Sequence, residues 1–375
     1  MKIILLGTAP LSIYTFRGEL VKELVKKGHD VLCMANGATE DDISSIKSLG
    51  CRYLDYNVER SGLNPFRDLG TLVTLIRVLR KEKPDVLFSY TIKPILWGGI
   101  ASRITKICVH IPMVTGLGYA FQKGGWRKRI LRTLVKYLYK ISLKGSQTVI
   151  FQNKDNMQLF QDLGIVSEMD CKVVNGSGVN LDLFKQSSIP EGKIRFLLIA
   201  RLLIDKGIRE YVEAAKIVSK SFPEVEFHLV GPFDPSPNGI SNNEIDAWKN
   251  IESVTYLGST KDVRPHIKDC TVYVLPSYHE GLPRTVLEAM AIGRPILTTD
   301  VPGCRETTIS GINGWLVKKG STDAIVEKMI WFLNNREMIR PMGERSRNIV
   351  EEKFDVNKVN KDIVDIINNS WDRTK

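Results

Sequence analysis

Short apolar runs alternate with longer amphipathic stretches along most of the chain. In the first half, runs rich in aliphatic residues cover 2–7, 29–35, 51–56, 85–90, 110–116 and 147–152. The stretches between them, such as 16–27, carry apolar residues at helical spacing. Strands that alternate with helices over this length predict a parallel, doubly wound α/β sheet.

The second half repeats the pattern, with apolar runs at 194–200, 225–231, 253–258, 271–276 and 294–299. The intervening segment 175–193 is rich in Gly, Ser and Asn, as linkers are. We therefore expect two Rossmann-like domains, 1–185 and 186–354, with a cleft between them. Ligands of such sheets bind beyond the carboxyl ends of the strands, so we expect the working site in that cleft.

The last segment, 355–371, has the apolar stripe of an amphipathic helix, with Val356, Val359, Ile363 and Ile367 on one face. We expect this helix to pack back on the N-terminal domain. A helix that closes the second domain fits the same pattern.

The composition is that of a globular protein, with 43% apolar and 25% charged residues. No apolar stretch approaches the roughly 20 residues of a membrane span. The apolar run within the first ten residues is too short for a signal peptide. The six cysteines are scattered, without a C-x-x-C pair, which favours reduced core residues. We expect a cytoplasmic protein, soluble or peripheral on the inner face of the cell membrane.

The net charge of +11 is carried by the first half of the chain. Residues 1–185 hold 27 Lys and Arg against 16 Asp and Glu, whereas residues 186–375 hold 26 of each. This asymmetry predicts an anionic partner for the N-terminal domain.

The densest basic stretch, 123–144, contains no acidic residue. Its cations are Lys123, Arg127, Lys128, Arg129, Arg132, Lys136, Lys140 and Lys144. Anionic lipid attracts each nearby basic residue by about 1 kcal/mol, which favours a membrane surface as the partner. Nucleic acid could use the same charges, but no nucleic-acid motif accompanies them.

Apolar residues are interleaved with these cations. Leu131, Leu134, Val135, Leu138 and Ile141 follow helical spacing and are expected to pack inward. Trp126 and the segment 119–121 are expected to anchor at the membrane interface. The predicted membrane-contacting residues are Trp126, Arg127, Lys128, Arg129, Arg132 and Lys136.

Two cations follow the apolar run 194–200. Arg201 and Lys206 lie five residues apart, just before a predicted helix that starts near Gly207. A guanidinium and an ammonium group at such a turn can close on one phosphate, supported by the amides of the helix N-terminus. Taken alone, the pair is better explained as ordinary surface charges on a solvated loop.

Two carboxylates lie in the strand–turn–helix pattern of 271–297. Glu280 is expected on the loop with Gly281, Leu282 and Pro283, and Glu288 in the second turn of the following helix. Carboxylates accept hydrogen bonds from sugar and ribose hydroxyls. Two of them at different depths can therefore hold the two ends of a sugar nucleotide.

Together, Arg201, Lys206, the run Glu280-Gly-Leu-Pro, Glu288 and the later Gly293-x-Pro295 resemble the donor domain of family 4 glycosyltransferases. The resemblance extends over nearly the whole chain and implies retaining enzymes of the GT-B fold. It implies that Arg201 and Lys206 bind the donor diphosphate, that Glu280 contacts donor-sugar hydroxyls and that Glu288 contacts the ribose. The turns at Gly258 and at 231–232 would lie near the base.

The five histidines show no metal-ligand spacing, so we expect no metal or other cofactor. Two cations and a helix terminus can stabilise a departing diphosphate by electrostatics. Many family members place a histidine after the strand equivalent to 111–115, whereas this chain has His110 before it. No general base is evident there, which fits transfer in which the leaving phosphate accepts the acceptor's proton.

The N-terminal domain is expected to bind the acceptor, because the segment 7–14 follows the first strand. The candidate acceptor residues are Thr8, Ser12, Tyr14, Arg17, Thr115 and Gly116. The segments 12–17, 63–66 and 116–118 resemble those of bacterial N-acetylgalactosaminyl-type transferases that extend polyprenyl-diphosphate-linked saccharides. This resemblance implies a UDP-N-acetylhexosamine donor and a lipid-linked acceptor. The alternatives are a soluble glycosyltransferase with a small metabolite acceptor and a non-catalytic nucleotide-sugar-binding protein.

Overall fold

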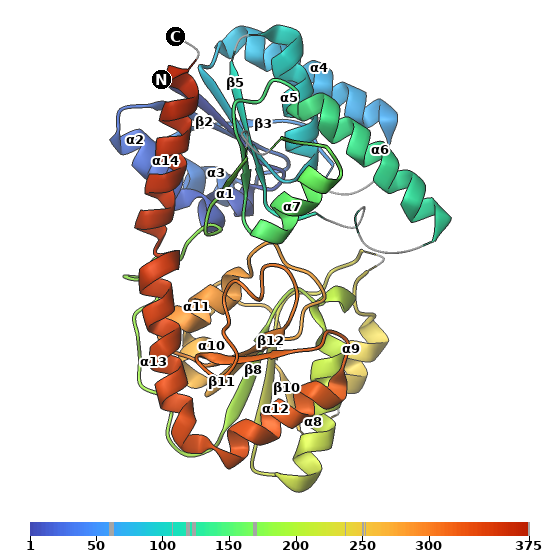
Figure 1. The fold of residues 1–375 in the computed structure, drawn as a ribbon, viewed down its shortest axis with the longest axis vertical. Helices are drawn as coiled ribbons and strands as arrows, with labels where there is room; N and C mark the ends of the chain where they lie inside the picture. Colours follow the sequence, from blue (N-terminus) through green and yellow to red (C-terminus); the bar gives the residue numbers. More distant parts are fainter. Residues whose placement is uncertain are drawn as a thin grey trace. The chain divides into compact units, whose positions relative to one another are not determined.

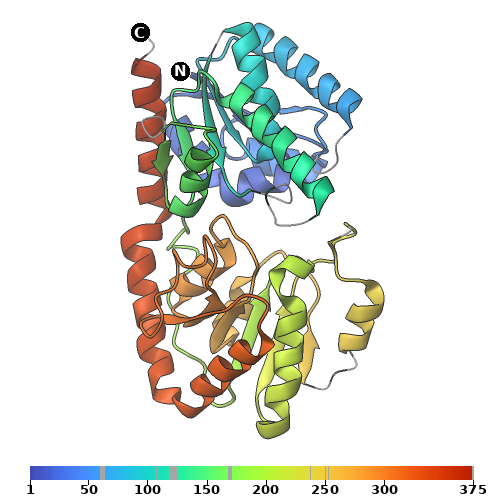
Figure 2. The ribbon, with the colours of Figure 1, turned by 45° about the vertical axis from the view of Figure 1, so that its right-hand side comes forward.

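The computed structural model describes residues 1–59, 64–106, 108–117, 121, 125–167, 171–236, 238–249, 251 and 253–373. The chain forms two compact units (Figures 1 and 2). Unit 1 comprises Met1–Ser177 and Asn357–Lys375, and unit 2 comprises Gly178–Val356.

Unit 1 is built on a seven-stranded parallel sheet in the order β3-β2-β1-β4-β5-β6-β7. The strands are β1 Lys2–Leu6, β2 Asp30–Ala35, β3 Arg52–Asp55, β4 Val86–Tyr90, β5 Val109–Val114, β6 Val149–Phe151 and β7 Cys171–Val173. The helices are α1 Pro10–Phe16, α2 Gly18–Lys26, α3 Glu40–Lys47, α4 Pro65–Glu82, α5 Ile92–Thr105, α6 Trp126–Leu143, α7 Lys154–Asp162 and α14 Val356–Asp372.

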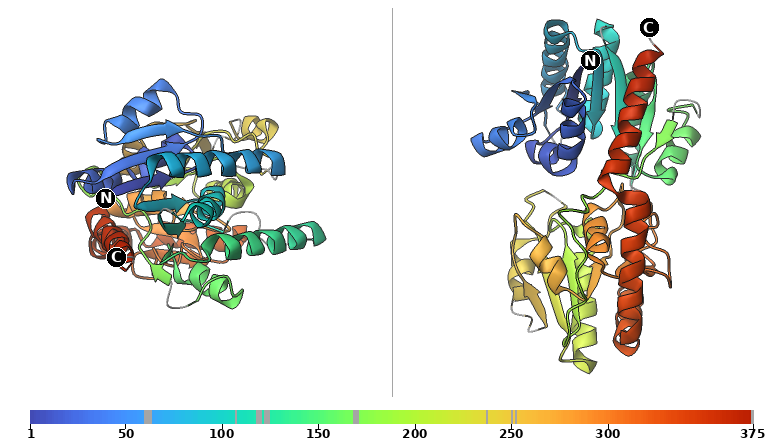
Figure 3. Two further views of the ribbon diagram at one scale, coloured as in Figure 1. Left: turned by 90° about the horizontal axis from the view of Figure 1, so that it is seen from above. Right: turned by 90° about the vertical axis from the view of Figure 1, so that its left-hand side faces the viewer.

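The alternation of side chains along β1 shows how this sheet is covered. Ile3 and Leu5 pack into a core that includes residues of α1, α2 and α14, whereas Ile4 and Leu6 pack against α4 and α5. Helices α4, α5 and α6 lie side by side in Figures 1 and 3. Both faces are thus buried, as a parallel sheet requires.

Unit 2 contains a six-stranded parallel sheet in the order β10-β9-β8-β11-β12-β13. Its strands are β8 Arg195–Ile199, β9 Glu226–Val230, β10 Val254–Tyr256, β11 Val272–Leu275, β12 Ile296–Thr299 and β13 Gly314–Val317. Its helical elements are η3 Ile204–Lys206, α8 Ile208–Ser221, α9 Asn242–Lys249, α10 Arg264–Asp269, α11 Arg284–Ile292, α12 Thr322–Asn334, η4 Arg336–Met338, α13 Ile339–Ile349 and η5 Val350–Phe354.

The segment 178–188 belongs to unit 2, although the sequence pattern placed the domain boundary at residue 185. Val179 is completely buried there, and its amide donates to the carbonyl of Phe354 over 2.8 Å. The buried Arg294 guanidinium donates to the carbonyls of Ser187 and Ser188, each over 3.0 Å. These bonds attach the polar segment to unit 2, so the chain divides after Ser177.

The last helix, α14, contributes to the core of unit 1. Val359, Ile363, Val364 and Ile367 are buried in the same cluster as residues of β1, β2 and β4. Only the first residue of α14 belongs to unit 2. The apolar stripe that predicted the helix is therefore the face that packs on the first sheet.

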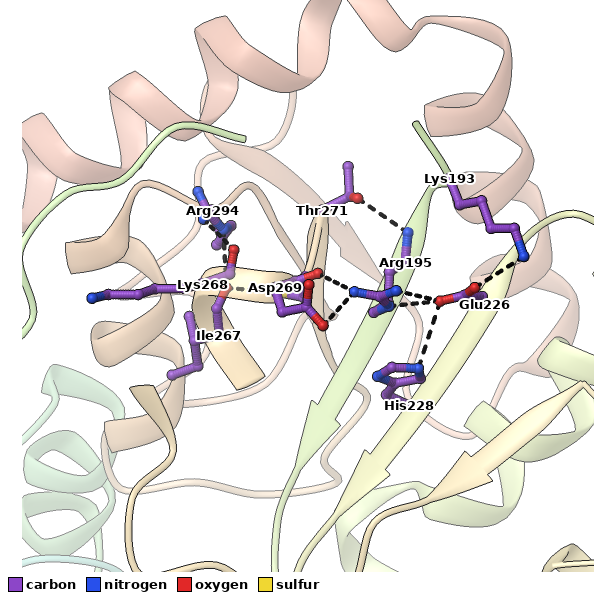
Figure 4. A network of polar contacts seen from close by, with 10 residues as sticks. Lys193, Arg195, Glu226, His228, Ile267, Lys268, Asp269, Thr271 and Arg294 are labelled. Carbon is purple, nitrogen blue, oxygen red and sulfur yellow. Dashed lines mark hydrogen bonds and ion pairs between the residues drawn. The ribbon is translucent and has the colours of Figure 1, made fainter. Parts of the chain in front are cut away.

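A closed charge network ties the amino ends of three strands in unit 2 (Figure 4). The Arg195 guanidinium on β8 lies between Glu226 on β9, where Nε donates over 2.8 Å, and the Asp269 carboxylate before β11. The Arg195 amide also donates to the hydroxyl of Thr271 over 3.1 Å. Arg195 thus pairs with both carboxylates, Glu226 and Asp269, and these ion pairs link the amino ends of the strands structurally.

Candidate active site

Each sheet has a switch point, a pair of neighbouring strands from which the chain proceeds in opposite directions. In unit 1 the pair is β1 and β4, and in unit 2 it is β8 and β11. The loops at the carboxyl ends of such a pair diverge and leave room for a ligand. Thr8 follows β1 in unit 1, and Lys206 and Glu280 follow β8 and β11 in unit 2.

At the carboxyl ends of β8 and β11, unit 2 brings two of the predicted donor residues into direct contact. The Nζ of Lys206 lies 2.6 Å from Oε1 of Glu280, and the two side chains are only 20% and 13% exposed. An ammonium and a carboxylate so shielded from water interact more strongly than a surface pair. We call this region, with Arg201, Lys206 and Glu280, the donor edge.

The two loops of the donor edge are held together by backbone contacts. The Tyr278 amide donates to the Asp205 carbonyl over 2.8 Å, and the Ser277 hydroxyl donates to the same oxygen over 3.1 Å. Gly207 has φ 71°, and a Cβ there would lie 2.1 Å from the Pro276 carbonyl oxygen. Only glycine fits this turn. The close approach of Gly207 to Pro276 fixes the position of Lys206 relative to the loop of Glu280.

Arg201 makes an ion pair that the sequence did not reveal. Its guanidinium donates to Oδ2 of Asp234 over 2.7 Å, with Asp234 on the loop after β9. Burial raises the pKa of Asp234, but hydrogen bonds from Ser236 and the charge of Arg201 outweigh it and lower the pKa overall. The neighbouring turn at 231–232 was the only signal in the sequence for this carboxylate.

Glu288 lies on the buried face of α11, in its second turn, as predicted. The residue is 8% exposed, and Nε of Arg284 donates to its Oε1 over 3.0 Å. Burial raises the pKa of Glu288, while Arg284 opposes that shift. Pro283 is the N-cap of α11, one position before the helix begins, and Gly281 and Leu282 lie on the loop ahead of it.

The two glycine turns expected near the base are adjacent. The Gly231 amide donates to the Gly258 carbonyl over 2.8 Å, which joins the loops after β9 and β10. The hydroxyl of Tyr256 donates to the Gly231 carbonyl over 2.9 Å. Gly258, φ 72°, has open space on its Cα.

His279, which no sequence pattern singled out, lies in the same loop directly before Glu280. Its Nε2 is buried with no hydrogen-bond partner among the described residues. Burial lowers the pKa of His279; Glu280 opposes that shift and Lys206 adds to it. The ring is therefore a neutral group beside Lys206 and Glu280, with one nitrogen able to exchange a hydrogen bond with a ligand.

In unit 1, the carboxyl ends of β1 and β4 carry neutral hydroxyl groups. Thr8 Oγ1 and Thr91 Oγ1 share a hydrogen bond of 2.6 Å, and Ser12 Oγ and the Tyr90 hydroxyl share one of 3.0 Å. Thr91 has φ 67° and ψ 159°, a conformation that costs a non-glycine residue about 1–3 kcal/mol. We call Thr8, Ser12, Tyr90 and Thr91 the hydroxyl cluster; Tyr90 and Thr91 were not predicted.

The other acceptor candidates are spread around this cluster. Tyr14 donates to Oδ1 of Asp42 over 2.8 Å, and burial, with this carboxylate adding, raises its pKa to about 12. Arg17 was a candidate acceptor residue, but it is 2% exposed, with its Cζ 5.4 Å from the centre of the Tyr90 ring. Its charge is held inside unit 1 by this packing. Thr115 and Gly116 follow β5 and are half-buried.

His110 is a core residue of unit 1. It is 4% exposed, and its ring nitrogens share hydrogen bonds with the hydroxyls of Ser89 at 2.7 Å and Ser146 at 3.0 Å. Burial lowers the pKa of His110 to about 3. The ring is therefore neutral at physiological pH and serves a structural role.

The basic stretch forms α6, and its packing differs from the expectation. Val135 is buried and Leu131 and Leu138 are partly buried, but Leu134 and Ile141 are 50% and 48% exposed. Arg127 and Lys128 are helical, with side chains outside the described part of the structure, and Tyr119 and Lys123 also lie outside it. Phe121, expected at a membrane interface, packs against Phe160 with ring centres 5.8 Å apart.

Within the described residues, no helix combines the length and apolar composition needed to cross a bilayer. In the same residues, no three His, Cys, Asp or Glu side chains gather as metal ligands. Among the described residues, the donor edge brings together Lys206 with Glu280, Arg201 with Asp234, and the buried ring of His279.

The comparisons with known proteins agree with this geometry. Residues 2–153 match the family described as "Glycosyl transferase 4-like", and residues 180–349 match "Glycosyl transferases group 1". The chain is 30% identical over 351 residues to an N,N'-diacetylbacillosaminyl-diphospho-undecaprenol alpha-1,3-N-acetylgalactosaminyltransferase of Campylobacter jejuni, covering 90% of this chain and 91% of that one. The chain therefore belongs to the family of group 1 and 4-like glycosyltransferases.

Further relatives of this glycosyltransferase include the UDP-Gal:alpha-D-GlcNAc-diphosphoundecaprenol alpha-1,3-galactosyltransferase of Escherichia coli. The two are 24% identical, over 78% of this chain and 77% of the relative. Among solved structures, Anabaena HepE in complex with UDP-glucose gives a TM-score of 0.79 at 17% identity, over 98% of this chain and all of that one. Sucrose-phosphate synthase of Thermosynechococcus elongatus gives 0.82 at 17% identity, over the full length of both chains. These structures confirm the GT-B fold.

Proposed function

We propose that this glycosyltransferase moves an N-acetylhexosamine from a UDP-sugar to a polyprenyl-diphosphate-linked saccharide at the inner face of the cell membrane. The observation that carries the proposal is the contact between Lys206 and Glu280 at the switch point of unit 2. A cation and a carboxylate at one ligand position match a donor that presents an anionic diphosphate beside neutral sugar hydroxyls.

Donor binding rearranges ion pairs that already exist. Lys206 and Arg201 are each neutralised by a carboxylate, Glu280 and Asp234 respectively. A diphosphate that arrives here shares or replaces those carboxylates, so the cations are never buried without a counter-charge. Glu280 then retains free acceptor positions for the donor-sugar hydroxyls.

The chemistry proposed is transfer with retention of anomeric configuration. The bond between the sugar C1 and the diphosphate oxygen breaks, and a bond between C1 and the acceptor hydroxyl oxygen forms on the same face. The hydroxyl proton passes to the leaving diphosphate, and Arg201 and Lys206 stabilise the charge that develops there. His110 has no part, because it is buried and neutral.

The nature of the acceptor is inferred from the relatives and from unit 1. The two most informative relatives are named for diphospho-undecaprenol saccharides. Neutral hydroxyls, such as those of the hydroxyl cluster, suit recognition of a saccharide. The two alternatives, a small soluble acceptor and nucleotide-sugar binding without turnover, differ from the proposal in their products.

The test is a product screen with the purified full-length chain. UDP- and GDP-activated sugars are paired with short-chain prenyl-diphosphate saccharides or free saccharides, and products are identified by mass. We expect transfer from a UDP-N-acetylhexosamine to the prenyl-linked acceptor, with an α-anomeric product by NMR when the donor is α-linked. Activity should persist in a chelator.

Each other outcome contradicts a named part of the proposal. Transfer to free saccharides alone would establish the soluble alternative, and UDP binding without transfer would establish the non-catalytic one. Inversion at C1 would contradict retention. Loss of activity in chelator, restored by manganese, would show that a metal is required.

A further inference from the structure

We infer that a pocket in unit 1, between α4 and the segments that follow β2 and β3, binds one sugar ring of the acceptor. The pocket has a volume of about 410 Å³. Small-molecule sites have volumes of roughly 300–1,000 Å³, so this pocket has room for one sugar ring with its substituents. Six polar residues line it: Asn36, Asn57, Glu59, Arg67, Thr71 and Thr74.

The polar groups of the pocket suit a neutral ligand that is rich in hydroxyls. In the part of the chain that the structure describes, the side-chain amide of Asn57 has no hydrogen-bond partner. Asn36 donates from Nδ2 to the Val58 carbonyl over 2.9 Å, which leaves its Oδ1 as an acceptor. Amide groups can donate to and accept from sugar hydroxyls. The two charged lining residues, Glu59 and Arg67, form an ion pair with each other, so the pocket has no net charge to attract a phosphate.

Gly70, which also lines the pocket, is the observation that points to a ligand. It lies in the second turn of the 18-residue helix α4, where glycine is less favourable than alanine. Its φ is not positive, and a Cβ on Gly70 would have no neighbouring atom within 4 Å among the described residues. Neither the backbone conformation nor packing inside the protein therefore requires glycine here. A side chain at this position would occupy the space that a ligand needs.

The first turn of α4 positions this wall of the pocket. Asn64 Oδ1 accepts from the amides of Phe66 over 3.1 Å and Arg67 over 3.3 Å, and Pro65 is the first helical residue. On a helix that turns about 100° per residue, Phe66 lies about 40° from Gly70. Phe66 is 84% exposed. Its ring is therefore available at the rim of the pocket, where the C–H face of a sugar can pack on it.

The pocket adjoins the hydroxyl cluster. The Asn36 amide donates to the Thr8 carbonyl over 3.2 Å, and the Tyr56 hydroxyl donates to the Gly7 carbonyl over 2.8 Å. Strands β1, β2 and β3 are neighbours in one parallel sheet, so the segments that follow them share one edge. A saccharide bound at the hydroxyl cluster can therefore extend into the pocket within unit 1.

This inference rests on the proposed function, because it assigns the pocket to the acceptor. The pocket itself is defined by unit 1 alone, and its binding of sugar can be measured without any transfer. A failure of the pocket and a failure of the proposed function are therefore separate results.

The test is Gly70→Leu, which fills the pocket from α4 and removes no interaction. With a short-chain prenyl-diphosphate saccharide as acceptor, we expect the acceptor KM to rise at least about tenfold and the donor KM to stay unchanged. Since leucine is favoured over glycine in a helix, the Tm should not fall, which separates lost binding from lost folding. The matched control is Val73→Leu, at an exposed position of α4 outside the pocket lining, which should leave both constants unchanged.

A second variant, Asn57→Ala, removes one side-chain amide from the pocket. The Thr71 hydroxyl donates to the backbone carbonyl of Asn57 over 2.7 Å, and this bond remains in the variant. We expect the acceptor KM to rise by about fivefold, the net value of one hydrogen bond. The control Asn242→Ala, at an exposed position of unit 2, should behave as the wild type does.

Sugar binding is measured directly by saturation-transfer difference NMR with free N-acetylglucosamine, N-acetylgalactosamine and glucose. We expect a signal from at least one sugar with the wild type and with Val73→Leu, and its loss with Gly70→Leu. Equal signals from the two variants, no signal from the wild type, or an unchanged acceptor KM in Gly70→Leu would overturn the inference. If Gly70→Leu abolishes sugar binding but no donor and acceptor give transfer, the proposed function is at fault and the sugar pocket stands.

Discussion

The two sheets present their switch points with opposite chemistry. At β8 and β11 of unit 2, the following segments carry Lys206 and Glu280 in contact at 2.6 Å, and Arg201 pairs with Asp234 on the loop after β9. At β1 and β4 of unit 1, the equivalent loops carry Thr8 and Thr91 in contact at 2.6 Å. One topology therefore supports a charged site and a neutral one.

We propose that the difference corresponds to the two substrates of a glycosyltransferase. A nucleotide diphosphate needs cations, and a departing diphosphate needs them most in the transition state. A saccharide presents hydroxyl groups, which hydroxyl side chains can bind as donors or acceptors. If this correspondence holds, variants of unit 2 will change donor kinetics and variants of unit 1 will change acceptor kinetics.

The largest effect is expected from Lys206→Ala. Removing one group that stabilises developing charge lowers kcat by about 10²- to 10³-fold. The substitution also leaves Glu280, whose side chain is 13% exposed, without the ammonium group that neutralises it. Initial rates with saturating donor and acceptor measure the change, and Lys216→Ala on α8 is the control. A kcat within twofold of the wild type would remove Lys206 from the site.

A smaller effect on the donor is expected from Glu288→Gln, with a distinct pH dependence. Burial raises the pKa of Glu288 above its ordinary value of 4.5, so the carboxylate of the wild type is lost at a higher pH than usual. We expect the donor KM of the wild type to rise as the pH falls through the raised pKa of Glu288, because a protonated carboxyl accepts ribose hydrogen bonds less well. The variant should have a donor KM about tenfold higher at neutral pH and almost no pH dependence.

The same shift has a consequence for stability. A carboxyl whose folded-state pKa is raised contributes stability below the unfolded pKa, and this contribution is lost as pH rises through the folded pKa. The stability of Glu288→Gln relative to the wild type should therefore increase as the pH rises through the folded-state pKa of Glu288. Thermal unfolding at several pH values checks the sign, and the opposite trend would contradict the burial of an ionisable carboxyl.

An effect confined to the acceptor is expected from Thr8→Val. The substitution keeps the shape of the side chain and removes its hydroxyl, which now bonds to Thr91. We expect the acceptor KM to rise by about fivefold, the net value of one hydrogen bond, with the donor KM unchanged. Kinetics with each substrate varied in turn separate the two constants. A change in the donor KM alone would reverse the assignment of the units.

The smallest effect on turnover is expected from His110→Asn. The histidine is buried between the hydroxyls of Ser89 and Ser146, so its loss should lower stability by about 1–3 kcal/mol. We expect kcat to remain within about twofold, because a ring with a pKa of about 3 is too weak a base to accept a proton near neutral pH. Denaturant unfolding and initial rates give the two values. A large loss of kcat with unchanged stability would make His110 catalytic.

Much of the fold follows from the sequence, because buried parallel strands read as continuous apolar runs. All eleven predicted strands occur within about two residues of their predicted ends, for example β8 at Arg195–Ile199 against 194–200. The edge strands β7 and β13 were missed. Cys171–Val173 is short and partly exposed, and Gly314–Val317 begins with a glycine, so neither shows a strand pattern.

The predictable part of the site was its charge. Arg201, Lys206 and Glu280 were singled out by their combination with Glu288 and Gly293-x-Pro295, which resembles family 4 glycosyltransferases; the spacing of each pair alone was a weak signal. Asp234, Tyr90 and Thr91 could not be found in that way, since each acts through a partner distant in sequence. The face of α6 was misjudged for a related reason, because Leu134 and Val135 both fit a helical stripe and only packing on unit 1 separates them.

The central claim, that the donor edge of unit 2 binds the nucleotide diphosphate, is tested most directly by calorimetric titration of UDP. The experiment compares the wild type with Arg201→Ala/Lys206→Ala and with the surface control Lys216→Ala/Arg340→Ala. We predict that the first double variant binds UDP at least about 100-fold more weakly, as expected when two charge-assisted contacts are lost, while the control is unchanged. Equal affinity in all three proteins would contradict the assignment of the donor site.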